Sequence, residues 1–452
     1  MKVKKGLKFL VPALAGIFCF AKVSLAESPE ELKAQIEALK KQMSTMQSQL
    51  DELQKKLKEV QTTTETLSPK ILPKDSKPVF GKPGFEWQLY GRVKVDYHYD
   101  TARMDFYNDF IGAVVNRWAN ATHKKTNYQN DSTNFNPRDT RLGAIVYSKV
   151  GNWMIKGQTE IDFYGTHAVN NIIPRIRLAF ADVTNTRTKT SILFGQDWIP
   201  VSQLNPSTVD FGILTAAGNL WWRVPQITVR QKVGDCWELL GSLMMHRRRS
   251  TASEERMPWV LARIEYRDGV LGKLFDKGSR VALGGGYKHG QHNSTIDDVD
   301  FWLLAGEWLF NFKLANQKMQ FKGEAWMGQG IGEEFLRYDL GVNPRTRKPI
   351  KGWGAWADLV WFINPKWSLA LGAGIDNPND SNILERLHAN PAIAPRLLGD
   401  RQFTQNVHYF INVWYSLTKD MRIGAEWVHV ETERKKWTDT ANRFTLSAFY
   451  SF

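Results

Sequence analysis

The chain has 452 residues, carries 60 basic and 46 acidic side chains, and is 42% hydrophobic. A helical membrane protein needs apolar runs of about 20 residues, but the longest apolar stretch here covers only 9–21 and contains Pro12. The composition therefore excludes a bundle of membrane-spanning helices, while the length allows one large domain or two of ordinary size.

Residues 1–26 have the form of a secretory signal peptide. Several lysines precede the apolar stretch 9–21, and Ser24-Leu25-Ala26 forms a small-x-small cleavage site. We expect cleavage after Ala26, which leaves Cys236 as the one cysteine of the mature chain. No intramolecular disulfide can then form. No Cys/His spacing is typical of a metal site, so we predict neither a metal nor a cofactor.

Residues 27–60 are predicted to form a helix that pairs with other copies of itself. Apolar residues from Leu32 to Val60 alternate in spacings of four and three without a break. This heptad pattern favours an oligomeric coiled coil over a lone amphipathic helix, because a straight helix would rotate the stripe away from its partner. The heptad pattern alone does not fix the number of helices in the coiled coil. We expect a trimer by analogy with membrane β-barrels, which commonly form trimers. Residues 61–84 contain four prolines among Thr, Ser and Lys, and predict an extended linker.

The remaining residues, 85–452, predict an all-β domain. In 442–452, apolar Phe444, Leu446, Ala448 and Tyr450 occupy one face and mostly polar residues occupy the other. An apolar outside and a polar inside are typical of a membrane barrel, although the edge of a soluble sandwich can look similar in one segment. Recurrence of the pattern favours a 16-stranded antiparallel transmembrane β-barrel. The predicted strands are 85–100, 139–150, 152–164, 173–183, 190–197, 221–233, 236–246, 257–267, 279–289, 299–310, 317–328, 352–363, 366–376, 404–416, 420–430 and 442–452.

The connections between these segments alternate in length. Short connections such as Gly234-Asp235 and Asn364-Pro365 alternate with long ones such as 101–138, 329–351 and 431–441. Outer-membrane barrels have short periplasmic turns and long outer loops. We therefore expect the barrel in the outer membrane of a Gram-negative type of cell, in contact with its lipid, with the N-terminal arm in the periplasm.

Basic side chains recur on the faces expected to line the interior. Rings of Arg and Lys favour anions in a narrow pore. Inward acids such as Glu160, Asp162, Glu307 and Glu324 could instead neutralise these charges in cross-strand pairs, and anion preference is the favoured alternative. The residues predicted to line a constriction or to bind the solute are Arg92, Lys94, Arg175, Arg177, Asp197, Gln203, Asp210, Arg223 and Arg230.

Alternation within 173–183 makes a specific prediction about faces. It places Arg175 and Arg177 inside and Ile176, Leu178 and Phe180 outside.

The connection 198–220 combines Pro and Gly with many apolar residues, including Ile199, Val201, Leu204 and Phe211. A loop exposed to water would not carry so many apolar groups. We therefore expect it to fold into the lumen, pack on the wall and form the constriction.

The same region carries a resemblance to a known family. Its motifs are Gly195-Gln196-Asp197-Trp198, Leu204-Asn205-Pro206, Val209-Asp210-Phe211-Gly212 and Arg223-Val224-Pro225-Gln226-Ile227. They resemble the DcaP-like trimeric outer-membrane porins, and the layout is also similar to that of phosphate-selective porins. The resemblance implies a homotrimer with a periplasmic coiled coil that passes small anions such as dicarboxylates. Ile199-Pro200 departs from the small hydroxylated residues expected there, which leaves the solute open.

The predicted function is passive diffusion through a wet pore. An enzyme is not expected, because the nine histidines are scattered and no nucleophile motif accompanies them. Nucleic-acid binding is not expected either, because basic residues are spread along strands rather than clustered on a helix. The alternative is a structural tether whose coiled coil contacts peptidoglycan.

Overall fold

The computed structural model describes the backbone of residues 79–82, scattered helical residues between 30 and 52, and most of 85–452. Outside the description of that last region lie 105–110, 115–129, 166–171, 213, 247–252, 256, 293–297, 333, 336–340, 344–345, 385–402 and 436. The predicted signal peptide and most of the predicted linker also lie outside the described residues. The chain divides into two compact units, 1–70 and 71–452.

Within the first unit, the described residues between Glu30 and Glu52 are helical. Hydrogen bonds from the Ser44 and Thr45 hydroxyls to the Lys41 carbonyl fit this conformation. Met43, on the predicted heptad seam, is 71% exposed. No helix in the described part of the chain is long and apolar enough to cross a membrane.

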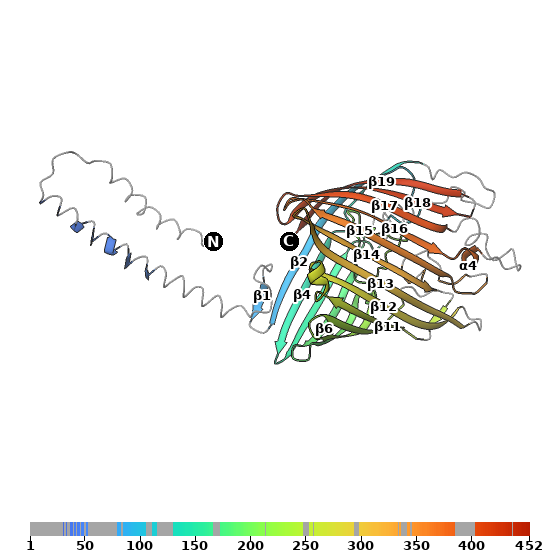
Figure 1. Ribbon diagram of the computed structural model, residues 1–452, viewed down its shortest axis with the longest axis horizontal. Coiled ribbons are helices and arrows are strands. Elements are labelled where there is room, and N and C mark those ends of the chain that lie inside the picture. The colour runs from blue at the N-terminus through green and yellow to red at the C-terminus, as the bar shows by residue number, and fades with distance from the viewer. Residues whose placement is uncertain are drawn as a thin grey trace. The chain divides into compact units, whose positions relative to one another are not determined.

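The second unit is a closed antiparallel barrel (Figure 1). Three short strands join its sheet: β1 (Val79–Lys82), β3 (Ser132–Asn136) and β10 (Ser253–Glu255). The sixteen longer strands found in the described residues form the wall, and β19 pairs with β2 to close it. These strands are β2 (Phe85–Asp100), β4 (Arg141–Val150), β5 (Trp153–Asp162), β6 (Arg175–Asn185), β7 (Thr190–Trp198), β8 (Arg223–Val233), β9 (Trp237–Met244), β11 (Trp259–Arg267), β12 (Asp276–His292), β13 (Asp298–Leu314), β14 (Gln317–Gln329), β15 (Lys351–Phe362), β16 (Trp367–Pro378), β17 (Phe403–Ser416), β18 (Met421–Arg434) and β19 (Trp437–Ser451).

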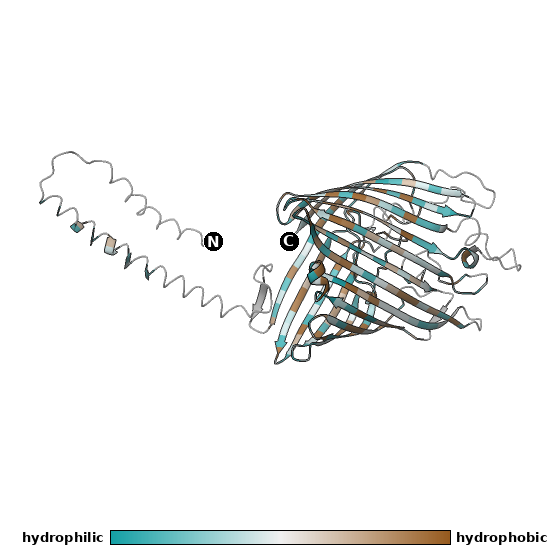
Figure 2. Ribbon diagram, in the orientation of Figure 1, coloured by the Kyte–Doolittle hydropathy of each residue, from teal (hydrophilic) through white to brown (hydrophobic). Residues whose placement is uncertain are grey.

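The two faces of the wall differ in the way the sequence predicts. On β19, Phe444 and Leu446 are 47% and 58% exposed, whereas Thr445 and Ser447 are 1% and 2% exposed. Apolar and polar residues alternate along the other strands as well (Figure 2). An apolar outer surface and a polar inner surface reverse the usual arrangement of a protein in water, and hydrocarbon is the solvent that such an outer surface suits.

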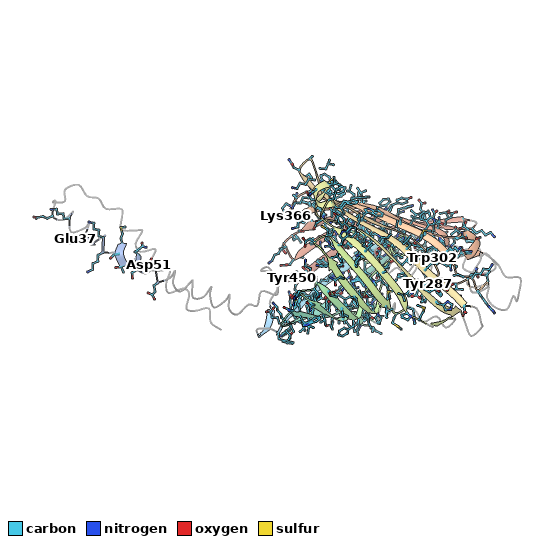
Figure 3. The ribbon with its side chains drawn as sticks, turned by 60° about the horizontal axis from the view of Figure 1, so that its bottom comes forward. Glu37, Asp51, Tyr287, Trp302, Lys366 and Tyr450 are labelled. Carbon is cyan, nitrogen blue, oxygen red and sulfur yellow. The ribbon has the colours of Figure 1, made fainter. Side chains whose placement is uncertain are left out.

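The barrel has a turn end and a loop end. The turn end carries short connections, among them 186–189, 315–316 and 363–366, and the loop end carries the longest ones. Tyr287 and Trp302 are cross-strand neighbours on β12 and β13, far from Lys366 and Tyr450 at the turn end (Figure 3). Two short helices lie in the connections: α3 (Leu271–Leu274) at the turn end and α4 (Asp380–Leu384) at the loop end.

One predicted loop is wrong. Residues 431–441 belong largely to strands, because β18 extends to Arg434 and β19 begins at Trp437. Their pairing continues to Arg434 opposite Trp437. The mixed charges of this stretch hid the alternation, but its inward residues Thr432 and Asp439 are fully buried.

A β-bulge also corrects the face assignment on β6. The register shifts so that Glu160 of β5 faces Leu178, while Ile161 faces Ile176. Arg177 is the extra residue between those pairs, and an extra residue reverses the alternation beyond it. Ile176 points outward as predicted, at 60% exposure, but Leu178 and Phe180 share the inner face with Glu160 and Gln158.

The bulge lies beside an unusual glycine. Gly195 on β7 pairs with Phe180 and has a φ of 125°. A Cβ there would lie 2.3 Å from the Ala179 carbonyl oxygen and 2.7 Å from the Phe180 Cα. Glycine adopts this conformation without steric cost, so Gly195 lets β7 continue past the bulge that presents Arg177.

Candidate functional site

The site is built around residues 199–222, here called the inner segment, which connect β7 to β8. Its backbone lies directly on glycines and alanines of the inner wall. A Cβ at Gly284 of β12 would lie 2.9 Å from Val201, and one at Gly374 of β16 would lie 2.0 Å from the Ala217 carbonyl oxygen. The segment therefore approaches the wall closely at positions where the wall carries no side chain.

Carboxylates on the inner face of β13–β18 hold this segment through its backbone N–H groups. Glu307 accepts from Gln203 and Leu204 at 2.7 and 2.6 Å. Four carboxylates from strands further round the barrel do the same: Asp358 with Ser207 N–H at 2.6 Å, Glu426 with Val209 and Asp210 N–H at 2.6 and 3.0 Å, Asp376 with Gly218 N–H at 3.3 Å and Glu324 with Leu220 N–H at 3.2 Å. Hydrogen bonds from amides to ionised carboxylates are stronger than those between neutral groups.

Apolar side chains of the inner segment are buried, as its composition predicts. Ile199 and Val201 are each 1% exposed and pack with Trp259, Phe301 and Trp326 of the wall strands. Burial of a residue of this size is worth about 1.5–3 kcal/mol. The hydrophobic core of the barrel is thus made between its inner wall and this segment.

A second stretch from the loop end packs beside the first. Residues 101–104 and 111–114 include Met104 and Val114, both fully buried. The Gly112 carbonyl accepts from the Asn406 side chain and lies 2.6 Å from His408 Nε2, while Arg434 donates to the Val114 carbonyl. Asn406 also donates to the Ala216 carbonyl of the inner segment, so one polar group joins both stretches.

On the opposite side, basic residues gather at the loop-end halves of β2–β8. We call Arg92, Lys94, Arg141, Arg175, Arg177 and Arg223 the basic wall. Arg92 and Arg141 are cross-strand neighbours and both donate to Asp139, whose other cationic neighbour, Lys94, lies 3.4 Å away. Burial raises the pKa of the Asp139 carboxyl, but the three cations outweigh it and hold that pKa far below its ordinary value.

Arg175 and Arg177 share the carboxylates of β5. Arg177 donates to Glu160 at 2.6 Å and to Asp162 at 2.9 Å, and its side chain is fully buried. Arg175 donates to Asp162 at 2.7 Å and remains partly exposed beside the rings of Tyr164 and Trp222. Predicted to face inward, both do so, but the bulge makes Arg177 the more enclosed of the two.

Arg223 is held by aromatic rings instead of carboxylates. Its guanidinium carbon lies 4.7, 5.8 and 5.3 Å from the ring centres of Trp198, Trp221 and Trp222. It is 6% exposed, and in the described residues no carboxylate lies within 4 Å of it. Cation–π contacts of this kind are worth about 2 kcal/mol when desolvated.

The remaining predicted residues are dispersed. Arg230 binds Asp182 at 3.2 Å and approaches Asp197 to 4.0 Å, nearer the turn end than the basic wall. Gln203 is partly buried, and its backbone, not its side chain, makes the bond to Glu307. The sequence thus assigned these residues to strands and to the loop, but it did not show that they lie apart from the basic wall.

Asp210 anchors the tip of the inner segment. Arg443 of β19 donates to Asp210 at 2.8 Å and to Asp100 of β2 at 2.6 Å. Burial raises the pKa of the Asp210 carboxyl, but Arg443, His98 and the Gly212 N–H lower it more, so it stays below its ordinary value. Each carboxylate oxygen of Asp210, predicted as a solute ligand, therefore accepts a hydrogen bond from the protein.

A cavity of about 420 Å³ separates the inner segment from the basic wall on its turn-end side. Arg92, Lys94 and Arg141 line it from the wall, and Ser207 and Thr208 line it from the segment. Arg422, Arg92 and Phe449 also line the cavity, and both guanidinium groups lie over the Phe449 ring. Its charged lining is mainly basic, with Asp139 and Asp210 as the acidic members, and the rest of the lining is made of amide, hydroxyl and apolar side chains.

Sequence reasoning missed Asp358, Asp376, Glu426 and Arg443. All four lie on inner faces, which alternation reveals, but their partners are far away in sequence; Asp210 and Arg443 are 233 residues apart. Among the described residues, no group of His, Cys, Asp and Glu side chains is arranged to hold a metal ion.

Comparison with known proteins identifies the fold. No protein-family model and no curated protein matches the sequence. The structure is similar to the outer membrane channel DcaP of Acinetobacter baumannii, with a TM-score of 0.66 and 22% identity over 82% of this chain and 99% of that chain. It is also similar to Salmonella typhi OmpF in complex with daunomycin (TM-score 0.52, 12% identity, 83% and 100%) and to OmpT of Vibrio cholerae (TM-score 0.50, 12% identity, 83% and 100%). The resemblance drawn from the motifs at 195–230 thus extends to the whole barrel, and the chain has the fold of the outer-membrane porins.

Proposed function

We propose that this protein is an outer-membrane porin, a passive diffusion channel that prefers small anions such as dicarboxylates or phosphate. In this proposal the inner segment is the constriction, and solutes pass between it and the basic wall. The DcaP-like family, a homotrimeric assembly and a position in a Gram-negative outer membrane belong to the same proposal. The fold shared with DcaP and OmpF supports it, and one OmpT structure is that of a trimer form.

The observation that carries anion preference is the different use of charge on the two sides of the lumen. Carboxylates on β13–β18 bind the backbone of the inner segment, as with Glu426 and Asp358. Their charge is therefore directed at that backbone. Across the cavity, the six cations of the basic wall are accompanied by four carboxylates, Asp96, Asp139, Glu160 and Asp162. A passing solute would meet a net positive field there.

Residues 27–60 would hold the trimer together on the periplasmic side. The exposure of Met43 on a helix with an unbroken heptad pattern supports a coiled coil, because such a seam gains stability only against a partner helix. Contact of this arm with peptidoglycan is compatible with a channel.

The reversal potential in a planar bilayer tests the anion preference. Under a potassium chloride gradient we expect the sign that corresponds to chloride permeation. The preference should decline as salt is raised, because the Debye length falls from about 10 Å at 0.1 M to about 3 Å at 1 M. A reversal potential of the opposite sign, indicating potassium preference, would contradict the proposal.

A further inference from the structure

A groove of about 230 Å³ crosses the outer surface of the barrel over β13–β16, near the loop end. Trp302, Met327 and Trp353 line it, and Gly328 and Gly352 lie between them. Met327 and Trp353 are cross-strand neighbours and are 51% and 47% exposed. Their side chains alternate with buried inward ones on the same strands, so the groove faces away from the lumen.

The aromatic rings around this groove have their wet side toward the loop end. Tyr287 and Trp302 are cross-strand neighbours on the outer surface (Figure 3). The Tyr287 hydroxyl donates at 2.7 Å to Asp300, which lies two residues nearer the loop end than Trp302. Tyr and Trp favour the level of lipid head groups, where one side of the ring is apolar and the other is wet. The groove therefore lies where the barrel would meet the head groups of the outer leaflet.

A polar cavity of about 400 Å³ continues the groove over β16–β18 and α4. Asn377 and Asn379 line both spaces. Asn377 lies opposite Trp353 and donates at 3.2 Å to Gln405, which in turn lies opposite Glu433. One outward row of side chains thus changes from apolar to polar as it crosses the strands. An apolar space and a polar space that adjoin in this way suit an amphiphilic molecule.

The charges of the two spaces are separated. Lys351 lines the groove two residues from Trp353, is exposed, and has no carboxylate within 4 Å in the described residues. Asp380 and Glu433 line the cavity, and among the same residues neither has a cationic partner within 4 Å. Lysine is a common ligand of phosphate. Carboxylates and side-chain amide oxygens accept hydrogen bonds from hydroxyl groups but repel a phosphate.

We propose that the groove and the cavity together bind one lipid with a phosphorylated sugar head group, taken from the outer leaflet. An acyl chain lies in the groove between Trp302 and Trp353, a phosphate binds Lys351, and sugar hydroxyls donate to Glu433 and its amide neighbours. A phospholipid would supply the phosphate but few hydroxyl donors for the cavity. A second copy of this chain would bury the carboxylates of the cavity without partners, which is costly.

This site rests on the proposed function for its position in an outer membrane, and it gives the channel a fixed lipid on its outer surface. Native mass spectrometry of the detergent-solubilised protein, titrated with lipid A, tests the site without requiring a channel. We expect saturable binding of one lipid A per chain at lower concentration than phosphatidylglycerol. Equal or tighter binding of phosphatidylglycerol would overturn the assignment of a sugar head group, and the absence of saturable binding would overturn the site itself.

Two outward tryptophans at opposite ends of the barrel provide matched variants. Trp353→Ala removes one side of the groove and should weaken the binding of lipid A about tenfold. Trp367→Ala removes a tryptophan of similar exposure, 42%, at the turn end and should leave binding unchanged. Equal effects of both variants would contradict the proposal. A changed oligomer mass with unchanged lipid binding in Trp353→Ala would identify the groove as a protein interface and overturn the lipid assignment.

Two lysine variants test the position of the phosphate. Lys351→Gln should weaken the binding of lipid A about tenfold, as expected for a hydrogen bond to a charged group, and should leave the binding of dephosphorylated lipid A unchanged. Lys366→Gln, at the turn end (Figure 3), should affect neither. Equal weakening of both lipids by Lys351→Gln would contradict a phosphate at this residue.

Unheated gel migration checks that each variant forms the barrel. A protein that passes current in the bilayer but shows no saturable binding of lipid A would refute the lipid site and leave the porin function standing. Saturable binding by a protein that passes no current would refute the porin function instead and support the site.

Discussion

Excision of residues 202–219, with Val201 joined to Leu220 by a short glycine-serine linker, is expected to increase single-channel conductance severalfold. A barrel of sixteen strands is too wide for its own side chains to fill and leaves an aqueous bore. In this protein the inner segment occupies much of that space and contacts strands from β12 to β19 through Glu307, Asp358 and Arg443, among others. Conductance in a planar bilayer measures the change.

Replacement of α3 (Leu271–Leu274) by the same linker is the control, because that helix lies at the turn end and buries none of its residues. It should leave conductance unchanged. Glu426→Ala offers a graded version of the excision, since it removes the acceptor for both the Val209 and Asp210 N–H groups. It should increase conductance less than excision and make the open current noisier. Unchanged conductance after excision would mean that the segment does not restrict the pore.

Arg177→Gln is expected to abolish anion preference and to destabilise the barrel by about 3–5 kcal/mol. Loss of one member of a buried ion pair leaves its partner charged and unpaired, which has this magnitude. Arg177 binds both Glu160 and Asp162 and is fully buried, so its removal leaves negative charge beside the basic wall. Reversal potential and urea unfolding in detergent measure the two effects.

Two further variants separate charge from folding. Arg187→Gln removes an exposed arginine at the turn end and should change neither quantity. Adding Glu160→Gln to Arg177→Gln removes one of the two carboxylates left behind and should restore part of the stability. If Arg177→Gln retained full chloride preference, the residue would have no part in selectivity.

The outer and inner faces could be predicted from sequence because strand alternation is a local property. On β19, the apolar positions Phe444 and Leu446 and the polar positions Thr445 and Ser447 occupy the predicted faces. The inward arginines of β2, β4 and β8 were found in the same way. The rule failed at Arg177, where one extra residue reverses the faces of Leu178 and Phe180. A bulge depends on the pairing of two strands and leaves no clear pattern in one of them.

Partners within the lumen could not be predicted for a related reason. Alternation of side chains along a strand identifies Glu307 and Glu426 as inward. Closure of the barrel and the path of the inner segment decide what they bind. The alternative that inward acids neutralise neighbouring bases holds for Glu160, Asp162 and Glu265. Glu324, however, accepts from the Leu220 N–H and the Ser202 hydroxyl of the inner segment. Charge counting along the strands would therefore underestimate the positive field across the cavity.

The most direct test of the account is a disulfide between the inner segment and the wall. In a Cys236→Ser background, Val201→Cys and Gly284→Cys should form a bond on mild oxidation, because a Cβ at Gly284 would face position 201, and Val201→Cys removes the Cγ2 methyl that lies 2.9 Å from it. Val201→Cys with Gly241→Cys, a position with nothing within 4 Å of its Cβ, should not. We expect the cross-linked protein to retain the conductance and ion preference of the parent channel. Failure of the first pair to cross-link, or a changed conductance once it has done so, would contradict an inner segment held against the wall.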